Sequence, residues 1–285
     1  MRLTIRDMQK LKNDGERIAM LTAYDATSAR LSEAAGVPAL LVGDSLGMVI
    51  QGHDSTIPVT LEQMIYHAGI VTRVTERPLI IGDLPFLTYS ISPEQALANA
   101  GRMMQEAGVG AVKLEGGVFM APTIARLVQN GIPVMGHIGL TPQSVNQFGG
   151  YRAQGRDLDT AQRLLDDARA VQDAGAFTIV LELVTTPVAQ MITEQLRIPT
   201  IGIGAGPHCD GQVQVFHDIL ALYEALMPRH SKPFAHVGEV IRQGIGDYVR
   251  EVQAGTFPTE AQSFAMKEEV AAALRKESLE PHENR

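Results

Sequence analysis

Five short apolar runs in the chain each end in a polar or charged side chain that could do chemistry. The residues that close these runs are Asp44, Asp83, Glu115, His137 and Glu182. Continuous apolar runs that stop abruptly are typical of buried parallel strands. Acids at the same end of several such strands would meet at one mouth of a barrel. There they could hold a divalent cation and move a proton.

Three of these acids, Asp44, Asp83 and Glu115, close successive runs. Neighbouring strands lie about 4.8 Å apart, so the three carboxylates could converge on one ion. Oxygen ligands without a Cys/His cluster suit Mg²⁺, with Mn²⁺ or Ca²⁺ as alternatives. For any one acid alone, the simpler interpretation is a cap on the backbone N–H groups of the following loop. The three together favour a metal site.

Lys113 and Ser45 are candidates for substrate contacts. Side chains alternate across a strand, so Lys113 should face the barrel lumen one layer below Glu115. A buried lysine is costly unless it is paired, and a structural ion pair between strands is the alternative interpretation. Ser45 lies between Gly43 and Gly47 and could donate to a substrate carboxylate. No nucleophile-elbow pattern surrounds it.

His137 and Glu182 are candidates for proton transfer. His137 could bind substrate or carry a proton, and a hydrogen-bonded histidine with no chemical role is the alternative. Glu182 is flanked by leucines, which could raise its pKa to a value that suits a general base at neutral pH. The alternative is another structural acid. The glycine-rich segment 202–206 could bind phosphate or let the chain pass close to a ligand.

These residues need a scaffold, and the order of elements predicts a closed (β/α)8 barrel. Helical stretches alternate with seven apolar runs, which predict parallel strands at 17–22, 39–43, 79–83, 111–115, 133–137, 177–182 and 200–204. An eighth strand is expected at 212–215 or 234–237. No glycine-rich nucleotide loop follows the first strand, which disfavours an open doubly wound sheet.

Residues 1–285 are predicted to form a single barrel domain with tails. A helix over about 4–13 should cover one end of the barrel, and another is expected over about 261–276 with a polar tail beyond it. Ser92 and Pro93 predict the start of a helix that runs to about Gly108. Asp159 or Thr160 should start the next long helix.

Composition limits the partners. The net charge is −8, which disfavours nucleic acid or an anionic membrane as the main partner. The sequence has no uncharged apolar span of membrane-crossing length, and its first residues lack the apolar segment of a secretion signal. The single cysteine, Cys209, cannot form an internal disulfide. A cytoplasmic location is therefore expected.

An ordered set of short motifs extends from about Thr22 to Leu222, and together they resemble the ketopantoate hydroxymethyltransferase family. No single motif is decisive, whereas the ordered set is highly specific. The motifs are Thr22-Ala23-Tyr24-Asp25, Gly43-Asp44-Ser45-Leu46-Gly47-Met48, Thr56-Ile57-Pro58-Val59-Thr60, Gly82-Asp83-Leu84-Pro85-Phe86, Lys113-Leu114-Glu115-Gly116-Gly117, Gly136-His137-Ile138-Gly139-Leu140-Thr141-Pro142-Gln143, Gly149-Gly150-Tyr151-Arg152 and Ile201-Gly202-Ile203-Gly204-Ala205-Gly206.

The resemblance implies a (β/α)8 barrel of the phosphoenolpyruvate/pyruvate type that binds Mg²⁺. It implies transfer of a one-carbon unit from 5,10-methylenetetrahydrofolate to 3-methyl-2-oxobutanoate, giving 2-dehydropantoate and tetrahydrofolate in pantothenate and coenzyme A biosynthesis. It also implies a homo-oligomer, a decamer of two pentameric rings.

The resemblance also implies roles for particular residues of this sequence. Asp44 and Asp83 would be metal ligands, with Glu115 completing the metal shell partly through water. The residues implied in substrate binding are Asp44, Ser45, Asp83, Lys113 and His137. Glu182 would be the proton acceptor.

The sequence departs from the family pattern in two places. Leu183-Val184-Thr185-Thr186 stands where many members have Cys-Val-Pro, and residues 232–236 lack a lysine-flanked form common in the family. Two other hypotheses stay open. One is a Mg²⁺-dependent 2-oxo acid lyase of the same superfamily, although its Lys-Lys-Cys-Gly-His-type loop is not found here. The other is a non-catalytic barrel that binds a keto acid.

Overall fold

The computed structural model describes residues 1–150, 152–223 and 228–279. The chain divides into two compact units, Met1–Ala235 and His236–Arg285. The first unit carries all the candidate site residues. The predicted single domain over 1–285 stays a prediction as regards the second unit.

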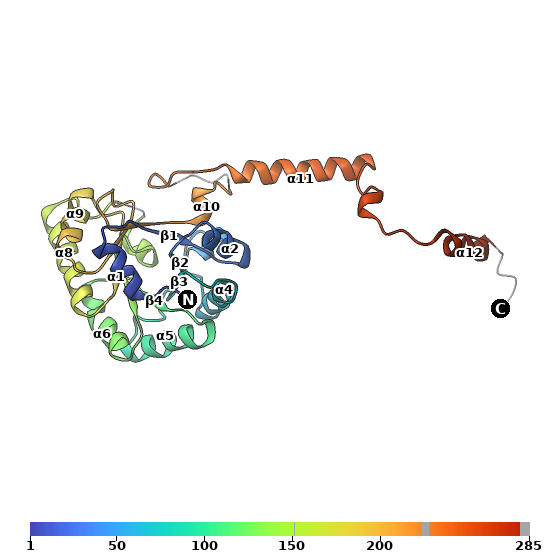
Figure 1. Cartoon of the computed structure of the whole chain (residues 1–285). Coiled ribbons are helices and arrows are strands. Elements are labelled where there is room, and N and C mark those ends of the chain that lie inside the picture. Colours follow the sequence, from blue (N-terminus) through green and yellow to red (C-terminus); the bar gives the residue numbers. More distant parts are fainter. Residues whose placement is uncertain (151, 224–227, 280–285) are drawn as a thin grey trace. The chain divides into compact units, whose positions relative to one another are not determined.

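Within the described part of the first unit, eight parallel strands close into a barrel in sequence order, with β1 paired to both β2 and β8 (Figure 1). The predicted (β/α)8 barrel is therefore confirmed. The eighth strand is the first of the two expected candidates, and residues 234–237 form no strand. The strands are β1 Ile18–Thr22, β2 Ala39–Val42, β3 Leu79–Asp83, β4 Ala111–Lys113, β5 Val134–Gly139, β6 Thr178–Glu182, β7 Thr200–Ile203 and β8 Gly211–Gln214.

Helices surround this barrel, and their first and last residues follow ordinary capping chemistry. Ser92 accepts a hydrogen bond from the Gln95 N–H, and Gly108 ends the same helix at φ 71°, as predicted. The predicted start at Asp159 or Thr160 is two or three residues too late, because Asp157 is the cap and accepts from the Thr160 N–H. The helices are α1 Ile5–Asn13, α2 Ala26–Ala34, α3 Leu46–Val49, α4 Leu61–Val74, α5 Pro93–Ala107, η1 Val118–Met120, α6 Ala121–Gln129, η2 Pro142–Ser144, α7 Val145–Phe148, α8 Leu158–Asp173, α9 Thr186–Gln195 and α10 Phe216–Ile219.

The inside of the barrel is a packed apolar core at its N-terminal end. Met20, Leu41, Ile81 and Met135 belong to one buried cluster inside the strands. Met8 of α1 joins this cluster, so α1 closes that end of the barrel, as predicted for the helix over about 4–13 (Figure 1). Among the described residues, this packing leaves the C-terminal mouth as the end of the lumen where a ligand can bind.

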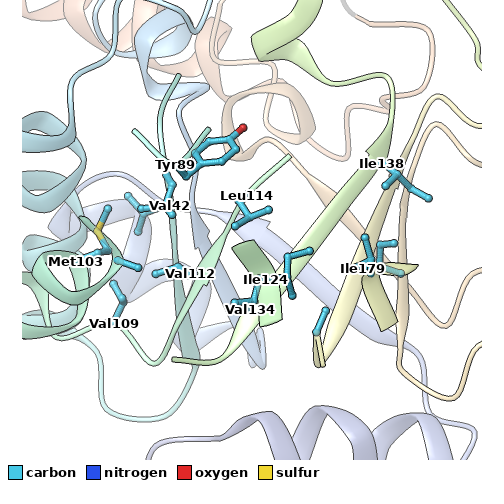
Figure 2. Close-up of a cluster of buried hydrophobic side chains, with 14 of the residues drawn as sticks. Val42, Tyr89, Met103, Val109, Val112, Leu114, Ile124, Val134, Ile138 and Ile179 are labelled. Carbon is cyan, nitrogen blue, oxygen red and sulfur yellow. The ribbon is translucent and has the colours of Figure 1, made fainter. Parts of the chain in front are cut away.

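A second apolar layer fills the space between the strands and the helices. Figure 2 shows Val112 and Leu114 of the β4 segment packed near Ile124 of α6, with Met103 of α5 nearby. Successive strand residues alternate between this outer layer and the lumen. Val112 and Leu114 take the outer positions, which leaves Lys113 to the lumen.

The second unit contains α11 Val237–Ala254, η3 Glu260–Gln262 and α12 Glu268–Leu279. The predicted helix over about 261–276 is therefore wrong in its start, because residues 260–262 form a separate short turn of helix. Helix α11 was not predicted, although apolar residues recur along it at helical spacing. Over its described length α11 buries none of its residues. The polar tail lies, for residues 280–285, outside the described residues.

Leu114→Ala tests the outer core. Leu114 is fully buried, so its truncation should lower the free energy of unfolding by about 3 kcal/mol through lost burial and a residual cavity. The midpoint of urea unfolding measures the effect. Leu158→Ala is the matched control, because Leu158 is 82% exposed and should change stability by less than about 0.5 kcal/mol. Equal midpoints for the two variants would contradict this packing.

Candidate active site

The candidate residues meet at the C-terminal mouth of the barrel. Asp83, Lys113 and His137 continue the inward-facing positions of β3, β4 and β5, two residues beyond Ile81, Ala111 and Met135 of the inner core. These three side chains and those of Asp44 and Glu115 belong to residues at most 4% exposed. Alternation along the strands thus places one acid, a lysine and a histidine on one inner surface.

Asp44 reaches the same place by a turn after β2. Its backbone N–H donates to Asp83 Oδ2 at 3.3 Å, which holds this turn against the end of β3. Gly43 permits the approach, because a Cβ there would lie 3.0 Å from Ser45 Oγ and 3.8 Å from Asp83 Oδ2. The Ser45 hydroxyl is in turn 2.8 Å from the Tyr24 hydroxyl.

Lys113 is the cation at the centre of the cluster. Its Nζ lies 2.8 Å from Asp83 Oδ1, 3.9 Å from Glu115 Oε1 and 3.2 Å from His137 Nδ1. Burial lowers the pKa of Lys113, but the charges of Asp83, Glu115 and Asp44 outweigh burial and raise it above its ordinary value. Lys113 is therefore charged at neutral pH and offsets part of the negative charge around it.

His137 links two carboxylates across the mouth. Its Nδ1 lies 3.4 Å from Glu115 Oε1, and its Nε2 lies 3.3 Å from Glu182 Oε2. Burial and the charge of Lys113 lower the pKa of His137, yet its interactions with Glu115 and Glu182 raise it to about 9. Glu182 is the most exposed member of this chain of contacts, with 14% of its side chain accessible. It can therefore meet a substrate that enters from the mouth.

Burial and mutual repulsion destabilise the charged form of two of these carboxylates, Asp44 and Asp83, and a bound cation would reverse this effect. Burial first, and then the charges of Asp83 and Glu115, raise the pKa of Asp44 well above its ordinary value. Burial also raises the pKa of Asp83. The buried oxygens Asp83 Oδ1 and Glu115 Oε1 face Lys113 but accept no well-aligned hydrogen bond. A cation placed among these oxygens would relieve both the repulsion and the missing bonds.

Among the residues that the structure describes, no three or more His, Cys, Asp or Glu side chains are arranged to hold a metal ion by themselves. Mg²⁺ does not need such a set, because it keeps several waters and is usually held by one or two carboxylates together with its substrate. Asp44 and Asp83, joined through the backbone N–H of Asp44, offer such a pair. The donor set therefore fits a hydrated Mg²⁺.

Sequence reasoning missed the residue that ties the acids together, Gln143. Its side-chain Nε2 donates to Asp44 Oδ2 at 2.9 Å, and its backbone N–H donates to Glu115 Oε2 at 3.1 Å. The Tyr89 hydroxyl donates to Gln143 Oε1 at 2.7 Å. Gln143 and Tyr89 lie outside the strands, so no periodicity marks them. The only available signal for Gln143 was its place in the motif that follows His137.

Two clefts lie in the first unit, and one of them borders the acid cluster. A cleft of about 230 Å³ adjoins it, because Glu115, Tyr89 and Gln143 form part of its wall. The glycine-rich segment 202–206 instead borders a separate cleft, whose wall includes Gly204, Gly206 and Arg229 but none of the clustered acids. Cys209 is buried beside that second cleft.

Several solved structures share the barrel architecture of this chain. A 2,3-dimethylmalate lyase, described as a PEP mutase/isocitrate lyase superfamily member, matches with a TM-score of 0.58 and 19% identity, covering 98% of each chain. A phosphoenolpyruvate phosphomutase from Streptomyces platensis subsp. rosaceus matches with a TM-score of 0.59 and 13% identity, covering 97% of this chain and 96% of that one. At these identities the likeness concerns the fold alone, which is the predicted (β/α)8 barrel.

Sequence relatives narrow the class to one family. The model of the ketopantoate hydroxymethyltransferase family matches residues 2–260. A 3-methyl-2-oxobutanoate hydroxymethyltransferase of Chloroflexus aurantiacus is 62% identical over 96% of this chain and 97% of its own length. One from Gluconacetobacter diazotrophicus is 60% identical over 97% of this chain and 100% of its own length. The chain belongs to the ketopantoate hydroxymethyltransferase family, as its motifs predicted.

Of the helices in the described ranges, none combines the length and the apolar character that crossing a bilayer requires.

Asp44→Asn should stabilise the metal-free protein at neutral pH by roughly 1–3 kcal/mol, because it removes a buried charge that its neighbours repel. The folded pKa of Asp44 lies above the unfolded one, so protonation favours the folded state. The gain should shrink as the pH falls through the folded pKa and vanish below the unfolded value near ~3.9.

Urea unfolding in EDTA at several pH values measures this gain as a difference from the parent protein. Asp173→Asn, at an exposed position of α8, is the control and should show no pH-dependent gain. An Asp44→Asn protein less stable than the parent at neutral pH would contradict the electrostatic interpretation.

Proposed function

We propose that the chain transfers a hydroxymethyl group from 5,10-methylenetetrahydrofolate to 3-methyl-2-oxobutanoate, giving 2-dehydropantoate and tetrahydrofolate. Membership of the family supports this reaction. The observation that carries it is the cluster at the barrel mouth, in which buried Lys113 faces Asp83 and Glu115, while His137 connects Glu115 to Glu182. The cluster holds the fixed charges and the proton acceptor that a keto acid needs to lose a proton.

Asp44 and Asp83 would hold the Mg²⁺, with Glu115 acting on it partly through water. When bound, the ion supplies Lewis-acid chemistry, which polarises the 2-oxo group and makes the C3 proton easier to remove. Gln143 holds the Asp44 and Glu115 carboxylates in place by donating to each. The Ser45 hydroxyl lies next to Asp44 in the chain and is available to bind the substrate carboxylate.

Glu182 takes the C3 proton of the keto acid. His137 Nε2 lies 3.3 Å from Glu182 Oε2, so it orients the carboxylate that accepts the proton. Lys113 remains charged and offsets the negative charge that develops on the substrate oxygen. The carbanion then forms a bond with the methylene carbon of the folate, and both bonds from that carbon to N5 and N10 break. Water supplies the hydroxyl oxygen of the product, and the C3 proton together with one proton of water completes the N–H groups of tetrahydrofolate.

The rival hypothesis of a 2-oxo acid lyase draws on the same barrel and the same acids. Its characteristic Lys-Lys-Cys-Gly-His-type loop is not in this sequence. Folate-dependent product formation separates the two reactions. A barrel that binds keto acid without catalysis would leave the C3 proton in place. Exchange of that proton with solvent therefore distinguishes the transferase from a non-catalytic barrel.

We also propose that the protein acts in the cytoplasm as a homo-oligomer, a decamer. The family resemblance supports the decamer, and the exposed apolar residues of α11, among them Val240, Ile245 and Tyr248, offer a surface for association. The net charge of −8 and the single cysteine support the location.

Glu182→Gln should retain Mg²⁺ and keto acid yet lose exchange of the C3 proton. Removal of a positioned general base typically costs about 10²–10⁴-fold in rate. Hydrogen–deuterium exchange of 3-methyl-2-oxobutanoate, followed by NMR with Mg²⁺ present, measures it. Glu194→Gln, an exposed position on α9, is the control. Normal exchange in Glu182→Gln would remove Glu182 from the role of base.

Asp83→Ala should weaken Mg²⁺ binding by more than about tenfold, because the variant lacks one of the two proposed ligands. Isothermal calorimetry of the folded variant with MgCl₂ measures the affinity. Asp83→Asn provides the same test with less change in volume beside Lys113. If both variants bind Mg²⁺ as tightly as the parent protein, the proposed metal ligands are wrong.

A further inference from the structure

The cleft of about 230 Å³ beside the acid cluster is not used by any step proposed for the keto acid. Its floor is shared with the cluster, through Glu115 and Gln143. Its outer walls come from the segment after β3, with Phe86 and Leu87, and from η1, with Phe119. A ligand in this cleft would therefore lie directly next to a keto acid bound by the cluster.

The outer walls carry three exposed apolar side chains. Phe119 is 75% exposed, and Phe86 and Leu87 are also exposed. Leu87 adopts φ 60°, a left-handed conformation that is strained for leucine. Such strain and exposed rings gather at binding sites rather than at random. Aromatic side chains of this kind pack against the face of a flat ring.

Asp167 of α8 gives the cleft a polar edge. Its Oδ1 accepts the Val118 N–H at 2.8 Å, and the carboxyl packs against Gly117, where a Cβ would lie 1.9 Å from Oδ1. The charge of Arg163 acts on this carboxyl, but Arg163 is not part of the cleft wall. An ionised carboxylate has about four acceptor sites, so Asp167 keeps acceptors free on both oxygens.

We propose that this cleft binds the pterin ring of the one-carbon donor, with Asp167 accepting hydrogen bonds from the 2-amino group and N3–H of the pterin. The proposal rests on the proposed function. Phe86 and Phe119 cover the faces of the ring, and Glu115 and Gln143 lie at the end where the donor meets the keto acid. The donor carbon thereby enters beside the substrate carbon that Glu182 deprotonates.

Charge decides against the keto acid itself as the occupant. Both acids that border the cleft, Asp167 and Glu115, would repel a second carboxylate. A pterin is neutral and presents two N–H donors side by side, which match two carboxylate oxygens. Thr141 and Gln147 add polar groups to the wall without adding positive charge.

The competing interpretation is that Asp167 only anchors the Val118 backbone. Asp167→Asn separates the two roles, because an asparagine oxygen can still accept the Val118 N–H while the amide no longer offers a second acceptor. Calorimetric titration with tetrahydrofolate should show affinity weakened by more than tenfold. The KM for methylenetetrahydrofolate should rise, while the KM for keto acid and the C3 exchange rate stay as in the parent protein.

Asp173→Asn, exposed on the same helix, is the matched control and should bind tetrahydrofolate normally. Phe119→Ala is a second variant. It leaves the Asp167–Val118 contact intact and should also weaken the binding of tetrahydrofolate.

Unchanged tetrahydrofolate affinity in both Asp167→Asn and Phe119→Ala would overturn the proposal. A parallel loss of keto acid affinity in Asp167→Asn would also overturn it, because that result would mark general damage to the mouth. Failure of the proposed function gives a different result, since the parent protein would then form no product from methylenetetrahydrofolate and keto acid.

Discussion

The charge balance around Lys113 is the constraint on which the rest of the structure depends. One buried ammonium group lies within 4 Å of both Asp83 and Glu115, and a third carboxylate, Asp44, also acts on it. Removing the charge of Lys113 would leave these carboxylates buried without a cation beside them, which is strongly destabilising. The barrel can hold the set because the strands around it are hydrogen-bonded into a closed ring that cannot spread apart.

The packing below this set keeps its geometry in place. Side chains such as Ile81 and Met135 fill the lumen beneath Asp83 and His137, and Met8 closes the far end. The apolar side chains therefore separate the polar cluster from the N-terminal end of the barrel, and the polar groups face the mouth. In such a dry environment, charges interact more strongly than in solution, which suits a site that must stabilise a developing negative charge.

The sequence predicted the site residues that lie at regular positions along a strand, and it missed those in segments without a regular repeat. Lys113 and Glu115 share a face because side chains alternate along a strand. Gln143 lies in the short helix η2 and Tyr89 in a loop, and neither segment has a repeat that indicates which way a side chain points. The expected three-carboxylate shell also depended on side-chain positions that strand spacing alone does not fix. Helix α11 is a different case, because its apolar residues recur at helical spacing and that pattern is sufficient to predict a helix.

Helix α1 (Ile5–Asn13) forms a plug at the N-terminal end of the barrel, so part of the apolar packing that stabilises the fold lies far from the reacting groups. Met8 and its neighbours lie at the opposite end of the lumen from Asp44 and Glu182. An engineer could repack the plug to raise thermal tolerance without altering turnover. Evolution has the same freedom, so organisms living at different temperatures can adjust one end of the barrel while the other keeps the same reaction.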